Sequence, residues 1–168
     1  MAYLFLPRHL TVASTFGVGV PAFFLALAPS SGAWRAAGFL RDVARFAVPA
    51  GVAVGGGVLA AYLAALHVAG LPVTEARTVS TTVLLAGMLF LLVALERRPA
   101  RRRRAVEMLA AVMVAGYAGV LLVPPVRAFF ALAAPTAELL ALAAGGSAVA
   151  WTLAPCGISR MRIRSRSR

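Results

Sequence analysis

The stretch TVASTFGVGVPAFFLALAPSS, Thr11 to Ser31, decides how this chain of 168 residues is interpreted. It carries no charge, and about 20 apolar residues suffice to cross the roughly 30 Å hydrocarbon core of a bilayer as a helix. Gly17, Gly19 and Pro21 nevertheless lie near its middle. Pro21 has no N–H to donate to the carbonyl of Gly17, and its ring crowds that carbonyl. The stretch therefore predicts a membrane-spanning helix with a built-in irregularity.

The composition of the whole chain indicates a membrane protein. Hydrophobic residues make up 61% of it, whereas soluble domains are typically about 45–50% apolar. The net charge is +12, and all 17 basic residues are Arg. Basic charge alone would suit nucleic acid, but this sequence has too little polar surface to offer, so we expect no nucleic-acid partner. High charge with high hydrophobicity is typical of a membrane protein whose charges lie in its loops, and the expected partner is the lipid bilayer.

Uncharged runs predict an all-α fold, a polytopic bundle of about five transmembrane helices in the cell membrane. The predicted spans are 10–30, 46–68, 78–95, 106–125 and 137–155. Short connections join them, so residues 1–155 are interpreted as one transmembrane bundle and residues 156–168 as an Arg/Ser-rich cytoplasmic tail. The segment GVAVGGG (51–57) contains Gly-x-x-x-Gly, which permits close helix crossing. We interpret it as internal packing rather than as a dimer face.

The placement of Arg predicts the orientation of the bundle. Arg is frequent before the second predicted span, in the connection ERRPARRRRAVE (96–107) and in the tail, and it is rare in the second and fourth connections. Because Arg-rich loops stay on the cytoplasmic side, the amino terminus is predicted outside and the carboxyl terminus in the cytoplasm. The Arg-rich connections then lie beside anionic lipid headgroups.

The start of the chain has a second interpretation. MAYLFLPRHLTV (1–12), the apolar run that follows and the ALA at 26–28 together imitate a signal peptide with a cleavage site. Against cleavage, the apolar run is longer than a usual signal-peptide core, and Arg8 lies behind Leu4–Leu6. We therefore expect a retained span.

The irregularity at Gly17 and Pro21 also has two interpretations. It is either a simple proline kink packed by small residues, or a place where freed backbone carbonyls face a cation near the membrane midplane, as in transporters with broken helices. In the second case Thr11, Ser14 and Thr15 lie on the preceding turns and add hydroxyl oxygens.

PRHLTVASTFGVGVPAFFLALAP (7–29) resembles the sixth membrane helix of P-type cation-transporting ATPases. That helix has the pattern Asn-x-x-Thr-Asp-Gly-x-Pro-Ala, then an apolar run and a further Pro, and residues 19–22 fall on Gly-x-Pro-Ala. GFLRDVARFAVPAG (38–51) is similar to the start of the seventh helix in a bacterial subgroup, and ARTVSTTVLL (76–85) to the start of the eighth. Five spans that end inside the cell resemble helices six to ten of a ten-helix pump, its carboxyl-terminal transmembrane half.

The resemblance implies part of the ion-translocation domain of a pump for a divalent cation such as Ca²⁺. The candidate ion-path residues are Ser14, Gly17, Val18 and Pro21. Ser14 stands at the family's Asn, and Val18 stands at the Asp that is a principal cation ligand in many members. Met88 falls where some calcium pumps have Glu. Divalent cations prefer several hard oxygens, usually with carboxylates, so either the missing half supplies the carboxylates or the ion or the number of ions differs.

The catalytic parts of such a pump do not occur in this sequence. The resemblance implies a phosphorylated Asp in Asp-Lys-Thr-Gly-Thr, a Thr-Gly-Glu loop, and ATP with Mg²⁺ in a soluble domain, but the chain has one Asp, Asp42, and no Lys. Phosphoryl transfer needs a metal-binding carboxylate cluster and phosphate-clamping groups. We therefore expect no catalytic residue, no cofactor and no ATP hydrolysis in this chain alone, with the remaining half of the pump and the transported cation as partners.

Other functions stay open. A stand-alone five-span membrane interaction or assembly protein would be stable without any dependence on a cation, and a non-functional pump fragment would have no activity. An independent small channel or carrier is disfavoured, because no second broken helix is evident in the sequence to pair with the first.

Overall fold

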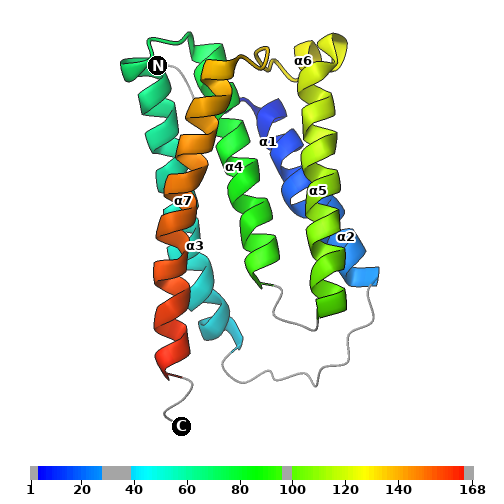
Figure 1. The fold of residues 1–168 in the computed structure, drawn as a ribbon, viewed down its shortest axis with the longest axis vertical. Helices are drawn as coiled ribbons and strands as arrows, with labels where there is room; N and C mark the ends of the chain where they lie inside the picture. Colours follow the sequence, from blue (N-terminus) through cyan, green and yellow to red (C-terminus); the bar gives the residue numbers. More distant parts are fainter. Residues whose placement is uncertain (1–3, 28–38, 96–99, 165–168) are drawn as a thin grey trace.

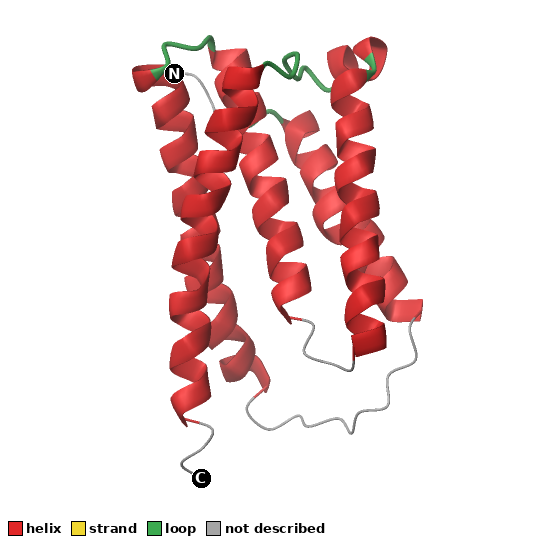
Figure 2. Ribbon diagram, in the orientation of Figure 1, coloured by secondary structure: helices red, strands yellow, loops and turns green. Residues whose placement is uncertain are grey.

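The computed structural model describes residues 4–27, 39–95 and 100–164, and within these ranges the regular structure is entirely helical (Figure 2). The elements are α1 (Pro7–Ser14), the π-helical turn η1 (Thr15–Gly19), α2 (Val20–Leu27), α3 (Phe39–Leu63), the π-helical turn η2 (Ala64–Val68), α4 (Val73–Leu95), α5 (Ala100–Leu122), α6 (Pro124–Phe129) and α7 (Ala137–Arg164). The predicted all-α fold is confirmed.

The long helices run alternately up and down along one direction (Figure 1). α2, α4 and α7 end at the same end of the bundle at which α3 and α5 begin. We call this the Arg-rich end, because the first two turns of α3 and α5 hold Arg41, Arg45, Arg103 and Arg104. The alternation that the Arg pattern predicts is thus present in the structure. Which end faces the cytoplasm stays a prediction.

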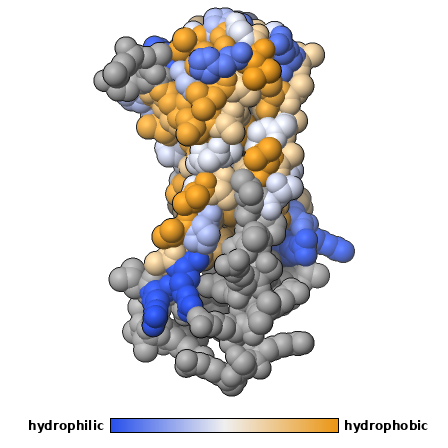
Figure 3. All heavy atoms as spheres, turned by 90° about the vertical axis from the view of Figure 1, so that its left-hand side faces the viewer, coloured by the Kyte–Doolittle hydropathy of each residue, from blue (hydrophilic) through white to orange (hydrophobic). Residues whose placement is uncertain are grey.

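The lengths of the apolar helices fit a multi-pass membrane protein. Among the described residues, four segments are long and apolar enough to cross a membrane, namely Pro7–Leu27, Val43–Val68, Val73–Leu95 and Arg103–Leu122. α7 adds a shorter apolar stretch, Ala137–Thr152. Figure 3 shows apolar side chains over much of one face, with hydrophilic residues near both ends. The structure therefore has four to five membrane-spanning helices.

Several helices extend beyond the predicted spans. α4 begins at Val73 and α5 at Ala100, so the Arg run at 101–104 belongs to the first turn of a helix and not to a loop. The physical reason is that Arg and Ala are good helix formers. A helix can therefore continue from the hydrocarbon into the headgroup region, while hydropathy marks only its apolar part.

α4 is the central helix of the bundle. It contacts α3 and α7 on one side, and α1, η1 and α5 on the other. The first apolar cluster joins α3, η2, α4 and α7 and contains Val54, Val58, Ala61, Tyr62, Ala65, Ala76, Val79, Val83, Leu139 and Ala143. The second joins α1, α4 and α5 with one residue of the α6–α7 connection and contains Val12, Leu85, Leu89, Ala110, Met113, Tyr117, Leu121 and Leu132.

Hydroxyl groups on α4 are buried but satisfied. The Thr78 hydroxyl donates to the carbonyl of Thr74 at 3.0 Å, and the Ser80 hydroxyl donates to the carbonyl of Ala76 at 2.9 Å. The Thr78 oxygen also accepts the N–H of Ala133, at 2.8 Å, which ties the α6–α7 connection to α4. An unsatisfied polar group in hydrocarbon costs several kcal/mol. These bonds let a helix rich in hydroxyls occupy the centre of the bundle.

Small residues set the distance between α3 and α7. A Cβ on Gly57 would lie 2.8 Å from the Cβ of Ala150 and 3.3 Å from the carbonyl oxygen of Gly146. The predicted internal packing of the 51–57 segment is thus confirmed at its last residue. Gly51 and Gly55, which form the Gly-x-x-x-Gly pair, have no atom within 4 Å of such a Cβ. They do not mark the helix crossing.

The substitution Gly57→Leu is expected to lower the free energy of unfolding by about 1–3 kcal/mol, because overpacking forces neighbouring backbone apart. Denaturant titration of the purified chain in detergent micelles, followed by circular dichroism, measures this loss. Gly55→Leu is the matched control: it lies on the same helix with open space around it, and it should change stability by less than about 0.5 kcal/mol. Equal losses in the two variants would contradict the close α3–α7 contact.

Candidate functional site

The irregularity of the first span is a π-helical turn and not an unwound segment. η1 covers Thr15–Gly19, and the N–H of Val20 donates to the carbonyl of Thr15, five residues earlier. Pro21 follows directly and has no N–H to offer to the carbonyl of Gly17. A π turn, which is wider than an α-helical turn, can accommodate a missing hydrogen bond inside a helix, and π turns are frequent at functional sites. The helix therefore stays continuous from α1 to α2.

The four predicted ion-path residues lie on the continuous helical segment formed by α1, η1 and α2, and they differ in exposure. Gly17 and Pro21 are buried, whereas Ser14 and Val18 are exposed. The Ser14 hydroxyl donates to the carbonyl of Thr11 at 3.1 Å, so its hydrogen is used inside the helix and its oxygen lone pairs stay available. The residues remain candidates, with two of them on a face that the described part of the chain leaves open.

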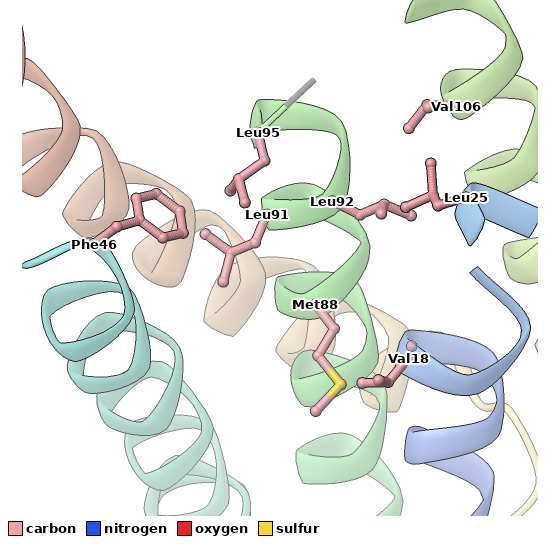
Figure 4. Close-up of a pocket in the computed structure, with 9 residues that line it drawn as sticks. Val18, Leu25, Phe46, Met88, Leu91, Leu92, Leu95 and Val106 are labelled. Carbon is pink, nitrogen blue, oxygen red and sulfur yellow. The ribbon is translucent and has the colours of Figure 1, made fainter. Parts of the chain in front are cut away.

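Met88 of α4 occupies the space beside Gly17. A Cβ on Gly17 would lie 2.5 Å from the Met88 sulfur and 3.2 Å from the Met88 Cβ. Figure 4 shows the Met88 side chain next to Val18. The structure therefore brings together two positions where the family resemblance implies carboxylates, and both carry apolar side chains here.

A cavity of about 340 Å³ lies at this contact, and we call it the apolar groove. It is lined by Gly17, Val18, Leu25, Phe46, Met88, Leu91, Leu92, Leu95 and Val106. These residues come from η1 and α2, from α4, and from the first turns of α3 and α5 (Figure 4). Within the ranges that the structure describes, no group of three or more His, Cys, Asp or Glu side chains could hold a metal ion. The described part of this chain offers a cation backbone carbonyls and hydroxyls.

A polar cluster at the opposite end of the bundle attaches α1 to the connection between α6 and α7. The His9 side chain is fully buried; its Nε2 lies 3.3 Å from the carbonyl oxygen of Ala131, and its Nδ1 accepts the N–H of Leu6 at 3.4 Å. A proton on Nε2 satisfies both contacts. Arg8 donates to the carbonyl of Phe129 at 3.3 Å. Sequence reasoning missed this cluster, because nothing local connects His9 with a carbonyl 122 positions away.

The fold and the interrupted first span define a class: the chain is a multi-pass helical protein that resembles the membrane region of a P-type cation-transporting ATPase. Over 100 residues it is 35% identical to the calcium-transporting ATPase CtpE of Mycolicibacterium smegmatis, which covers 58% of this chain and 12% of that protein. Over 66 residues it is 44% identical to the calcium-transporting ATPase CtpE of Mycobacterium bovis and to that of Mycobacterium tuberculosis. Each of these matches covers 39% of this chain and 8% of the relative.

These matches confirm the resemblance that the sequence of the first span indicated. They also limit its extent, since the matched residues span 12% of the length of the Mycolicibacterium smegmatis protein. No family model and no solved structure matches the chain.

Replacing Gly17 by Val is expected to lower the free energy of unfolding by about 1–3 kcal/mol, because the added side chain collides with Met88. Gly19→Val is the matched control, since its Cβ would have its nearest neighbour, the Ser14 carbonyl oxygen, at an ordinary 3.5 Å. Denaturant titrations in detergent micelles measure both.

A double-mutant cycle with Met88→Ala tests the contact itself. Removing the thioether creates the space that Val needs, so the loss caused by Gly17→Val should be smaller in the Met88→Ala background, with a coupling of at least about 0.5 kcal/mol. Additive losses would show that Gly17 and Met88 do not touch.

Proposed function

We propose that this chain forms the carboxyl-terminal membrane part of an ATP-driven cation pump of the P-type, in the cell membrane, with its carboxyl terminus in the cytoplasm. The observation that carries the proposal is the π-helical turn at Thr15–Gly19, packed through Gly17 on Met88 of α4, in a chain similar to calcium-transporting ATPases. An interrupted helix is a means of presenting backbone oxygens to a cation inside a membrane.

The transported ion in this proposal is a divalent cation, Ca²⁺ before others. Ca²⁺ takes six to eight oxygen ligands, and carbonyls of the η1 turn with the Ser14 hydroxyl supply a minority of them. Val18 and Met88 add none, so the carboxylates come from the other half of the pump. The first span has room for that half beside it. Only 17% of an apolar 18-residue window of this span is buried against the described residues.

Energy enters the proposed pump through that other half. ATP and Mg²⁺ bind there, on a soluble domain that this chain's sequence does not encode, and the phosphorylated Asp belongs to the same domain. The role of this chain is to position η1 against α4 and to transmit helix movement. The two halves belong to one polypeptide or to two that assemble.

A second candidate is a membrane assembly protein that reuses this set of helices without moving ions. One observation favours it, namely that the side chains lining the apolar groove include no carboxylate. A measurement of ion transport distinguishes the pump from the assembly protein.

Inverted membrane vesicles measure the proposed activity as ATP-dependent uptake of ⁴⁵Ca²⁺. Deleting the coding region of this chain is expected to abolish the uptake, and restoring the wild-type sequence to return it. Ser14→Ala should raise the Ca²⁺ concentration for half-maximal uptake at least about tenfold, since one ligand to a charged group contributes about 1.5–3 kcal/mol. Thr152→Ala is the control, because its exposed hydroxyl also bonds to a helix carbonyl, that of Val149. Uptake that survives the deletion would overturn the pump and favour the assembly protein.

A further inference from the structure

We propose that the apolar groove binds one acyl chain of an anionic phospholipid, whose headgroup is held by arginines of the Arg-rich end. The proposal does not depend on whether the chain belongs to a pump. It rests on the shape of the groove, on the charge at its mouth, and on the fit of the occupant.

The groove is elongated along the helix axis. Four of its lining residues, Met88, Leu91, Leu92 and Leu95, are spaced as one face of α4. At a rise of 1.5 Å per residue, this face extends over about 10 Å. Every lining side chain is apolar, and the volume of about 340 Å³ lies within the range of roughly 300–1,000 Å³ that is usual for small-molecule pockets. An apolar groove of this length and volume suits a hydrocarbon chain.

The groove runs to the Arg-rich end. Leu95 is the last residue of α4, Phe46 follows Arg45 directly, and Val106 lies two residues after Arg104. The side chains of Arg45 and Arg104 are exposed. The apolar lining therefore ends where the basic residues begin, which is the arrangement that a phospholipid tail and headgroup require.

The charge at this end favours an anionic headgroup. Residues 39–45 and 100–107, the described residues that flank the groove, contain six Arg and two acidic residues, a net charge of +4. Among the acidic side chains that the structure describes there, Glu107 is paired with Arg103 at 2.8 Å. Basic pockets between membrane helices bind anionic lipid headgroups. An Arg run in the first turn of α5 also opposes the helix dipole, and a nearby phosphate reduces that repulsion.

The occupant to which we commit is a lipid tail and not a neighbouring transmembrane segment. The basic residues beside the apolar lining favour a lipid, because a phospholipid carries its anionic headgroup directly at the end of an apolar tail.

Native mass spectrometry of the full chain in detergent micelles tests the proposal, with equimolar dioleoyl phosphatidylglycerol and dioleoyl phosphatidylcholine as probes. We expect one bound phosphatidylglycerol and at least a tenfold preference for it. The double variant Arg45→Gln with Arg104→Gln should remove the preference. Arg8→Gln with Arg127→Gln makes the same charge change in segments at the opposite end, and it should retain the preference. Equal binding of the two lipids, or equal effects of the two double variants, would overturn the proposal.

Crosslinking to the wild-type chain locates the acyl chain, and two Trp variants then test the groove. Phosphatidylglycerol with a photoactivatable acyl chain should crosslink the wild-type chain within 88–95 and at Val106. Met88→Trp, which fills the groove, should weaken these crosslinks at least tenfold, whereas Val112→Trp, on the exposed side of α5, should not. Crosslinks spread evenly over the apolar surface would overturn the groove as the site.

Discussion

Every polar group in the hydrocarbon must find its partner inside the protein, and the structure of this chain is organised around the helix where that constraint is strongest. α4 places Thr78, Ser80 and Thr81 in the centre of the bundle with no exposed surface. Each hydroxyl is bonded to a carbonyl one turn earlier. Because these groups are satisfied within α4, both of its sides are free to pack. α3 and α7 occupy one side, and α1, η1 and α5 the other.

The same constraint explains the first span. Pro21 offers no N–H to the carbonyl of Gly17 in the middle of a membrane segment, and the π-helical turn that precedes it keeps the helix continuous. Gly17 then lets this turn approach Met88 of α4. A backbone irregularity and a close helix contact meet at one place, beside the apolar groove. The contact links the local sequence to the part of the molecule where we place the ion path and the lipid tail.

Much of the architecture could be predicted from the sequence. The uncharged runs predicted the helical bundle, and the alternation of Arg predicted which connections share an end, because hydropathy and charge are local properties of the chain. Gly17 and Pro21 located the irregularity, but its form depends on how neighbouring hydrogen bonds rearrange, so the π turn was not foreseen.

Contacts between distant helices were not predictable in the same way. The Gly51–Gly55 pattern pointed to a helix crossing, yet the crossing uses Gly57, since the rotation of α3 about its axis is fixed by α4 and α7. The burial of His9 against Ala131 depends on the path of the α6–α7 connection. Likewise, sequence comparison placed Val18 and Met88 at family ligand positions, but only the packing of η1 on α4 brings them together.

If these helices are the membrane part of a larger pump, native membranes contain them in a much larger protein or in a complex with one. The most direct test is a blot of native membranes with an antibody raised to residues 97–104, combined with affinity purification of the recognised protein. For the membrane part of a pump we expect a band several times larger than 17.4 kDa, or a band near 17.4 kDa that copurifies with a large phosphorylatable partner. A band near 17.4 kDa that purifies alone would contradict this expectation and identify an independent membrane protein.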